Sequence, residues 1–262
     1  MLKLSPCIEM MWSDVEFAAR IPRVAALGFN AFEFWGWWNK DLDAVEKAAK
    51  DAGLDVAVCC VKTAFTDKVA PMLLPEGKAA FVEAVKDCIK LVPKLNCRCF
   101  IVTTGNELPN VPRAAQHKAC VEALKAAAPF VEDAGVTLVL EPLNLLVDHK
   151  GYYLSTSAEG FRILDEVGSP AVKLLFDIYH QQITEGNLTR NICDNIVKIG
   201  HFHVANNPGR HEPAIGEINY PYLFTRIREA GYKHYLGLEF SPSDTARTDE
   251  ILKDVLKVAS AC

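Results

Sequence analysis

Hydrophobic and polar positions along the chain follow two patterns, one typical of strands and one typical of helices. Short runs rich in β-branched and aromatic residues recur about every thirty residues, and each is followed by a segment with apolar residues three and four positions apart. The runs predict strands at residues 2–10, 30–36, 54–62, 97–104, 136–142, 172–179, 199–205 and 234–240. The segments between them predict helices at 14–27, 41–52, 76–95, 113–133, 155–167, 220–230 and 248–259.

Glycines in the segments LGFN, AGLD, AGVT and AGYK mark the ends of predicted helices, just ahead of the next strand. A glycine there can adopt the left-handed conformation that ends a helix and turns the chain back. Eight such repeats favour an α/β fold, the (β/α)8 TIM barrel, formed as a single domain by residues 1–262. An open doubly wound sheet usually has fewer strands and a glycine-rich first turn, and neither GxGxxG nor GxxxxGK[ST] occurs.

The charge balance narrows the partners to be expected. Acidic residues number 33 against 28 basic ones, which gives a net charge of −5, and no block rich in lysine or arginine occurs. Because a protein that follows a nucleic-acid backbone needs a clustered basic face, no nucleic-acid partner is expected. Pro6 and Glu9 interrupt the N-terminal segment, and no uninterrupted apolar run is long enough to span a membrane, so neither a targeting peptide nor a membrane partner is expected.

The nine cysteines are odd in number and scattered, and they form no CxxC pair. Most lie in apolar strand or helix contexts such as DVAVCCV, where a buried and reduced thiol is the expected form. Disulfides and thiolate zinc sites fit this distribution less well. Reduced thiols indicate a cytoplasmic location.

Charged or imidazole side chains end four consecutive predicted strands. They are Glu141, Asp177, His203 and Glu239. In a TIM barrel the chemistry is located at the C-terminal ends of the strands. Because side chains alternate along a strand, the leucines and phenylalanines beside these residues can face the helices only if all four point toward the barrel axis.

Each of these carboxylates alone could cap the next helix or face solvent. Three carboxylates that converge within a few ångströms would repel one another unless they were protonated or bridged by a cation. One divalent metal ion resolves this repulsion. A donor set of three carboxylates and one imidazole suits Mn²⁺, Mg²⁺ or Co²⁺ better than it suits zinc, whose sites are richer in histidine and cysteine.

Four sequence motifs carry a resemblance to a known family. They are LEPLN at 140–144, FDIYHQQ at 176–182, IGHFHVANNPGRHEPAIGEINY from 199, and GLEF at 237–240. With them the chain resembles the hydroxypyruvate isomerase family of the xylose isomerase-like TIM barrels, which is related to the ketose 3-epimerases. The resemblance implies that Glu141, Asp177, His203 and Glu239 hold one divalent ion, that Glu141 and Glu239 exchange protons with the substrate, and that His180 and Arg210 contact it.

Other polar residues near these motifs receive supporting roles. His201 would lie one layer deeper than His203, and we expect a hydrogen-bonded core histidine rather than a ligand. Glu33 and Glu9 end the second and first strands, so they could reach the pocket, but a supporting or loop role is equally consistent with the sequence. Glu217 is expected to organise its loop or to cap the helix that follows. Tryptophans cluster after the first two strands, where they could wall off water or cover an oligomer contact: Trp12, Trp35, Trp37 and Trp38.

The implied reaction moves a proton between adjacent carbons of a small α-hydroxy carbonyl compound through an enediolate. For hydroxypyruvate the product would be tartronate semialdehyde, and Arg210 is the first candidate to bind the substrate carboxylate. Epimerisation of a ketose at the same site is the alternative. Ketose 3-epimerases of the psicose and tagatose type usually carry a further glutamate six residues after the strand-five metal glutamate. Here Val147, followed by Asp148, occupies that position, which favours the isomerase.

More distant alternatives use the same barrel. A metal-dependent hydrolase similar to endonuclease IV would need more histidines and a basic surface, and a catalytically silent sugar-binding barrel would not need the two glutamates. The expected partner is therefore a small keto acid or ketose. The family often forms dimers or tetramers, and the sequence does not choose between these states.

Overall fold

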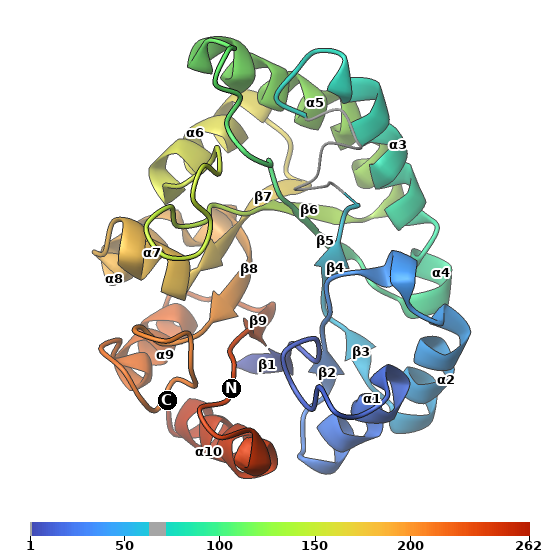
Figure 1. Ribbon diagram of the computed structural model, residues 1–262, viewed down its shortest axis with the longest axis vertical. Coiled ribbons are helices and arrows are strands. Elements are labelled where there is room, and N and C mark those ends of the chain that lie inside the picture. Colours follow the sequence, from blue (N-terminus) through green and yellow to red (C-terminus); the bar gives the residue numbers. More distant parts are fainter. Residues whose placement is uncertain (1, 63–71) are drawn as a thin grey trace.

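The computed structural model describes residues 2–62 and 72–262 and forms a ring of parallel strands surrounded by helices (Figure 1). The strands are β1 (Lys3–Pro6), β2 (Ala31–Phe32), β3 (Asp55–Val56), β4 (Cys59–Cys60), β5 (Cys99–Val102), β6 (Thr137–Leu140), β7 (Val172–Asp177), β8 (Ile199–Val204) and β9 (Tyr235–Leu238). The helices are α1 (Phe17–Ala26), α2 (Leu42–Ala52), α3 (Gly77–Ile89), α4 (Val92–Leu95), α5 (Arg113–Ala134), α6 (Ser157–Val167), α7 (Ile178–Thr184), α8 (Leu188–Asn195), α9 (Tyr220–Glu229) and α10 (Thr248–Ala261). Short 3₁₀ turns occur at η1 (Trp37–Asn39), η2 (Ile196–Lys198) and η3 (Thr245–Arg247).

Hydrogen bonds close the ring of strands. One parallel sheet runs in the order β1-β9-β8-β7-β6-β5-β4, and β2 pairs with β3. Glu33, directly after β2, joins the pair to β1, because its N–H donates to Pro6 O at 3.0 Å and its carbonyl accepts from Ile8 N at 3.0 Å. β3 and β4 are two parts of the strand predicted at 54–62: β3 pairs with β2, and β4 pairs with β5. The predicted TIM barrel is therefore confirmed.

The predicted alternation of side chains along the strands is also present. Inside the ring, four apolar side chains from β5, β6, β7 and the segment between β3 and β4 form a small core of their own: Val58, Ile101, Val139 and Leu175. Leu138 and Leu140 belong instead to the large core between the sheet and the helices. The period of two thus sets which residue of each strand reaches the inside of the barrel.

Two predicted elements differ from the observed ones. The strand predicted at 172–179 ends at Asp177, whose Oδ1 accepts from His180 N at 2.9 Å and caps α7. Neither α7 nor α8 was predicted, because both are short; α7 follows the strand directly, and α8 follows α7. The helix predicted at 76–95 is divided into α3 and α4, since Pro93 has no N–H to continue the ladder of hydrogen bonds.

All nine cysteines are free thiols, and five of them are buried. Cys59 Sγ and Cys97 Sγ lie 3.8 Å apart, a contact distance well beyond the roughly 2.05 Å of a disulfide bond. Within residues 2–62 and 72–262, no helix combines the length and the apolar character needed to cross a membrane.

Candidate metal centre

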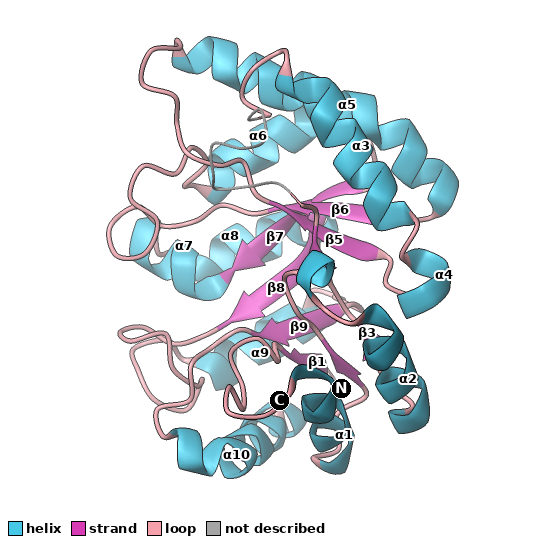
Figure 2. Cartoon of the chain, turned by 45° about the vertical axis from the view of Figure 1, so that its right-hand side comes forward, coloured by secondary structure: helices cyan, strands magenta, loops and turns pink. Residues whose placement is uncertain are grey.

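The four strand-end residues predicted as ligands meet at one point. Glu141 directly follows β6, Asp177 ends β7, His203 lies in β8, and Glu239 directly follows β9. Each offers one ligand atom, these atoms all lie within 4.8 Å of one another, and the four side chains are buried. Because β6, β7, β8 and β9 are neighbours in the sheet, consecutive strands deliver the whole cluster. Figure 2 shows β7 and β8 pointing toward the loop-rich end of the barrel.

The ring of His203 points its Nδ1 atom into the three carboxylates. Nδ1 lies 3.0 Å from Glu141 Oε1, 3.2 Å from Glu239 Oε2 and 3.8 Å from Asp177 Oδ2. Ligand atoms bound at about 2.1 Å to one ion in octahedral geometry are about 3 Å apart, so this spacing fits a shared divalent cation. Burial lowers the pKa of the His203 imidazole, but Glu239 and Glu141 raise it well above its usual value. The cluster thus favours positive charge at its centre.

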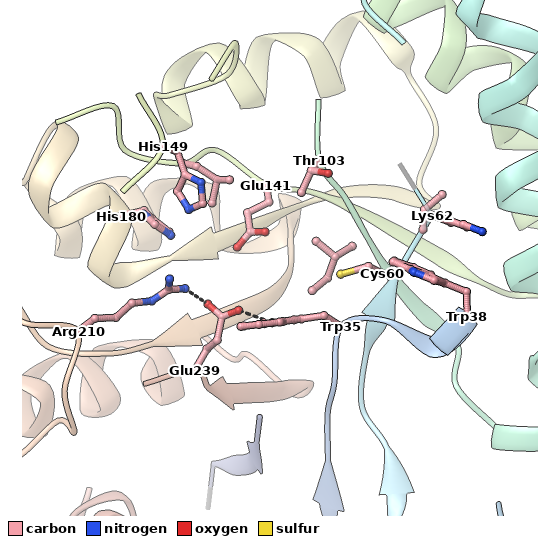
Figure 3. A pocket seen from close by; sticks show the side chains of 13 residues that line it. Trp35, Trp38, Cys60, Lys62, Thr103, Glu141, His149, His180, Arg210 and Glu239 are labelled. Carbon is pink, nitrogen blue, oxygen red and sulfur yellow. Dashed lines mark hydrogen bonds and ion pairs between the residues drawn. The ribbon is translucent and has the colours of Figure 1, made fainter. Parts of the chain in front are cut away.

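Glu239 makes two further contacts that orient its carboxylate. Trp35 Nε1 donates to Oε1 at 2.6 Å, and the Arg210 guanidinium forms an ion pair with Oε2 (Figure 3). Burial opposes ionisation of Glu239, but His203 and Arg210 hold the pKa of its carboxyl well below the usual value. Burial raises the pKa of Asp177 instead, and Arg210 only partly offsets that shift. Within one cluster, the carboxyl of Glu239 thus has a lowered pKa and that of Asp177 a raised one.

His180 is a neutral hydrogen-bond donor directed into the site. Burial, and then the charge of Arg210, lower its pKa to about 3. Asn144 Oδ1 accepts from the backbone N–H groups of Val147 and Asp148, so the Asn144 Nδ2 group must face His180 Nδ1, 2.7 Å away. His180 Nδ1 is therefore the acceptor, and the proton is on Nε2. Nε2 is buried without a hydrogen-bond partner among the described residues.

A pocket of about 530 Å³ opens above the cluster, a volume suited to a small molecule. Its wall contains four residues singled out in the sequence: Glu141, His180, Arg210 and Glu239. Trp35 and Trp38, from the predicted tryptophan cluster, line the pocket as well. Trp12 lies elsewhere: its Nε1 donates to Asp249 Oδ1 of α10 at 2.8 Å. Sequence reasoning missed Cys60, Lys62, Thr103 and His149, which also line the pocket (Figure 3). None of these four forms part of a recognisable motif.

The loop after β6 departs from the epimerase pattern in space as well as in sequence. Val147, at the position of the further epimerase glutamate, is 67% exposed. Asp148 Oδ2 accepts from Asn144 Nδ2 at 2.7 Å, so Asp148 holds the loop and is absent from the pocket lining. His149 enters the pocket instead, with its ring centroid 5.2 Å from that of His180.

Three residues left open in the sequence have clear surroundings. Glu33 lies beneath the cluster, with Oε2 3.1 Å from His201 Nε2 and Oε1 3.3 Å from His203 Nε2. His201 is a buried, hydrogen-bonded histidine outside the set of four candidate ligands, although it forms a second group of potential donors with Glu33 and His203. Glu9 pairs with Lys40 at 3.0 Å in the surrounding loops.

Glu217 lies in the loop between β8 and α9. Its Oε1 accepts from Asn207 Nδ2 at 2.7 Å and from Gln182 Nε2 at 3.0 Å. These contacts fit the predicted role of organising the loop.

Known proteins resemble the chain over nearly its whole length. The family described as xylose isomerase-like TIM barrel matches residues 21–260. A hydroxypyruvate isomerase from Escherichia coli (strain K12) is 28% identical and covers 94% of this chain and 95% of its own. A 2-oxo-tetronate isomerase from Cupriavidus necator is 32% identical, with 90% and 91% covered.

A solved structure gives the same fold. The crystal structure of AP endonuclease, family 2, from Brucella melitensis has a TM-score of 0.89 and 27% identity, and it covers 96% of this chain and 97% of that one. The named relatives in sequence are isomerases, and the chain is accordingly an enzyme of the isomerase or epimerase class. The chain belongs to the xylose isomerase-like TIM barrel family, within its hydroxypyruvate isomerase branch.

Proposed function

We propose that this enzyme is a metal-dependent isomerase that moves a proton between adjacent carbons of a small 2-oxo acid, with hydroxypyruvate or a related keto acid as substrate. One observation carries the proposal. Of the four clustered residues, Glu141 and Glu239 line the pocket, whereas Asp177 and His203 lie buried behind them. The two carboxylates that a substrate can touch are thus the two assigned to proton transfer, whereas Asp177 and His203 can help to hold the ion without contacting the substrate.

Glu141, Asp177, His203 and Glu239 would hold one Mn²⁺, Mg²⁺ or Co²⁺ ion. A bound divalent cation supplies Lewis acidity that polarises the substrate carbonyl and acidifies the neighbouring C–H bond. One of the two pocket glutamates removes that proton, and the resulting enediolate receives a proton at the adjacent carbon. The proton of the original hydroxyl passes to the former carbonyl oxygen, so that the hydroxyl and the carbonyl exchange places. Glu141 and Glu239 reach the pocket from different strands (Figure 3), so they can act on different positions of the same substrate.

Two donors are available to the remaining oxygens of the substrate. His180 Nε2 carries a proton and is directed into the site, so it can donate to a hydroxyl or carbonyl oxygen. Arg210 Nε is buried without a hydrogen-bond partner in the described part of the chain, and a guanidinium suits a carboxylate. This supports an acid substrate, as in the names of the hydroxypyruvate and 2-oxo-tetronate isomerases.

Ketose 3-epimerisation is the second candidate, because a pair of glutamates at one carbon can also exchange a proton between its two faces. The exposed Val147 and the entry of His149 in place of an acidic residue favour the isomerase. A DNA-cleaving role like the one named for the Brucella melitensis protein is less well supported, since the net charge is −5.

The test is deuterium exchange in D₂O. Protein treated with EDTA is incubated with hydroxypyruvate, 2-oxo-tetronate, fructose or psicose, before and after addition of Mn²⁺, Mg²⁺ or Co²⁺, and exchange and products are followed by NMR. We expect metal-dependent exchange and an aldehyde product from a keto acid. Exchange confined to the ketoses would replace the isomerase by the epimerase. Absence of exchange with every substrate, or cleavage of an oligonucleotide that contains an abasic site, would overturn the proposal.

A further inference from the structure

We propose that Glu33 is a positioning residue for His203: its carboxylate holds the imidazole in the tautomer and orientation that present Nδ1 to the ion. The inference deepens the proposed function and rests on its metal site. It adds Glu33, the residue directly after β2, to a cluster otherwise delivered by β6 to β9.

Both ring nitrogens of His203 face carboxylates, but in different layers. Nδ1 faces the three carboxylates of the metal centre, whereas Nε2 lies 3.3 Å from Glu33 Oε1. Neither His203 Nε2 nor Glu33 Oε1 has a hydrogen-bond partner among the described residues, so the ion-pair distance of 3.3 Å is the contact that joins these two atoms. Both side chains are 1% exposed, so water does not compete freely for the contact.

The contact selects one tautomer. A carboxylate only accepts hydrogen bonds, so Glu33 favours the form of His203 that carries its proton on Nε2. Nδ1 then keeps its lone pair, as a metal ligand must. A carboxylate behind a ligating histidine also increases the basicity of the ligating nitrogen and fixes the ring plane, and loss of such a partner typically weakens metal binding about 10- to 100-fold.

Glu33 is itself held in place by two donors on its other oxygen. Ser5 Oγ donates to Oε2 at 2.6 Å, and His201 Nε2 lies 3.1 Å from the same atom. With Oε2 occupied, Oε1 is the oxygen left for His203. This arrangement gives His201, two residues before His203 on the same strand, a role in supporting the ligand without binding the ion.

Gly237 provides the space for this carboxylate. It pairs with His203 in the β8–β9 register, and a Cβ atom added there would lie 2.1 Å from Glu33 Oε1 and 2.5 Å from Oε2. Any side chain at position 237 would therefore displace Glu33 from His203.

Glu33, His201 and His203 could in principle hold a second ion, since their donor atoms are close together. That ion would require His203 to bind through both nitrogens at once, and His201 Nε2 would lose the proton that it can donate to Glu33 Oε2. A hydrogen-bonded relay satisfies the same atoms without losing either proton. The number of ions bound per chain distinguishes the two arrangements.

The experiment compares Glu33→Gln with Ser5→Ala as the matched control. Gln keeps the size of the side chain but removes the charge, whereas Ser5→Ala removes one support of Glu33 and leaves its contact with His203. Mn²⁺ affinity is measured from the EPR signal of free ion, stoichiometry by elemental analysis, and folding by circular dichroism. We expect one ion per chain, affinity about 10- to 100-fold weaker in Glu33→Gln, and a smaller loss of affinity in Ser5→Ala, in which His201 still holds Glu33 Oε2.

The outcomes separate this inference from the proposed function. A wild-type protein that binds no divalent ion would remove the metal site itself. Wild-type binding with unchanged affinity in folded Glu33→Gln would overturn the positioning role, and so would two ions per chain with the second lost in that variant. If Glu33→Gln does not fold, ¹⁵N-histidine NMR of the Mg²⁺-loaded wild type decides, with His203 assigned from His203→Asn. A proton on Nε2 supports the inference, and a proton on Nδ1 contradicts it.

Discussion

At the scale of the residue, the contacts of each polar atom in the pocket decide what it can do. The Oε1 atom of Glu239 accepts a hydrogen bond from Trp35, and its Oε2 atom forms ion pairs with Arg210 and His203. His180 has one nitrogen bound by Asn144 and the other directed to the pocket. These two side chains therefore give the sharpest predictions about turnover.

Replacement of Glu239 by Gln should retain the fold and lower kcat by about 10²–10⁴-fold, because an amide cannot accept or return a proton. Turnover is measured at saturating metal and substrate. Trp35→Phe is the control, since it removes one hydrogen bond to Glu239 but leaves the carboxylate. Near-normal turnover of Glu239→Gln would exclude this residue from the acid–base pair.

Replacement of Asn144 by Asp should alter His180 at a distance from the substrate. A carboxylate at position 144 would accept a hydrogen bond from His180 Nδ1–H and so favour the neutral tautomer in which Nε2 lacks the proton that it presents to the pocket. We expect kcat/KM to fall about tenfold or more, as for other partners that orient a functional histidine. Asp148→Asn is the control, since Asn144 keeps its place there. If His180→Gln and the double variant with Asn144→Asp do not share the same loss, the two residues act independently.

At the scale of the element, Asp177 has two functions at one boundary. Its Oδ1 accepts from His180 N and begins α7, while its Oδ2 belongs to the candidate metal cluster, 3.8 Å from His203 Nδ1. The sequence predicted the ligand from the end of the strand but missed the helix. Seven residues with one capping side chain give too little periodicity to be recognised as a helix.

The two functions of Asp177 can be separated by two substitutions. Asn caps helices as well as Asp, so Asp177→Asn and Asp177→Ala lose the same charge but only Ala loses the cap. In metal-free protein we expect the Ala variant to be less stable than the Asn variant by about 1 kcal/mol, measured by urea unfolding. Both should bind Mn²⁺ much more weakly than wild type. Equal stability of the two variants would show that the cap contributes nothing to α7.

At the scale of the whole molecule, the packing between sheet and helices controls the chemistry of the thiols. Burial raises the pKa of Cys88 and of Cys120 to about 12, so at pH 8 only about one thiol in ten thousand is ionised at these positions. The shift keeps both groups protonated throughout the physiological range, and they become thiolates only as the pH approaches 12.

Native protein at pH 8 should therefore show few thiols that react rapidly with a disulfide reagent, and all nine cysteines should react in denaturant. Four thiols are partly exposed, but burial holds the pKa of Cys60 and Cys99 well above the usual value. The rapid reaction is therefore assigned to Cys193 and Cys262, and their Ser variants should remove it. The coloured product released by the disulfide reagent is followed over time, which gives the number of reactive thiols and their rates of reaction. Rapid reaction of the five buried thiols in native protein would contradict the packing described for the barrel.

The sequence by itself determined the elements and their inward faces. Strand length, the period of two, and glycines at helix ends are local properties, so the TIM barrel and the inward direction of Val139 followed from them. For the same reason Glu141, Asp177, His203 and Glu239 could be identified before any contact was known, since each ends a strand and parallel strands end at one rim.

Only the tertiary structure decided which of these side chains touch, and what lies behind them. Glu33 and His201 are 168 positions apart, and no local pattern fixes the tilt and stagger that bring them within 3.1 Å. The same holds for the loop after β6, where the hydrogen bonds of Asn144 turn Asp148 away and His149 into the pocket. The period of two predicts which way each side chain of a strand points, whereas contacts between side chains of different strands depend on how the whole barrel closes.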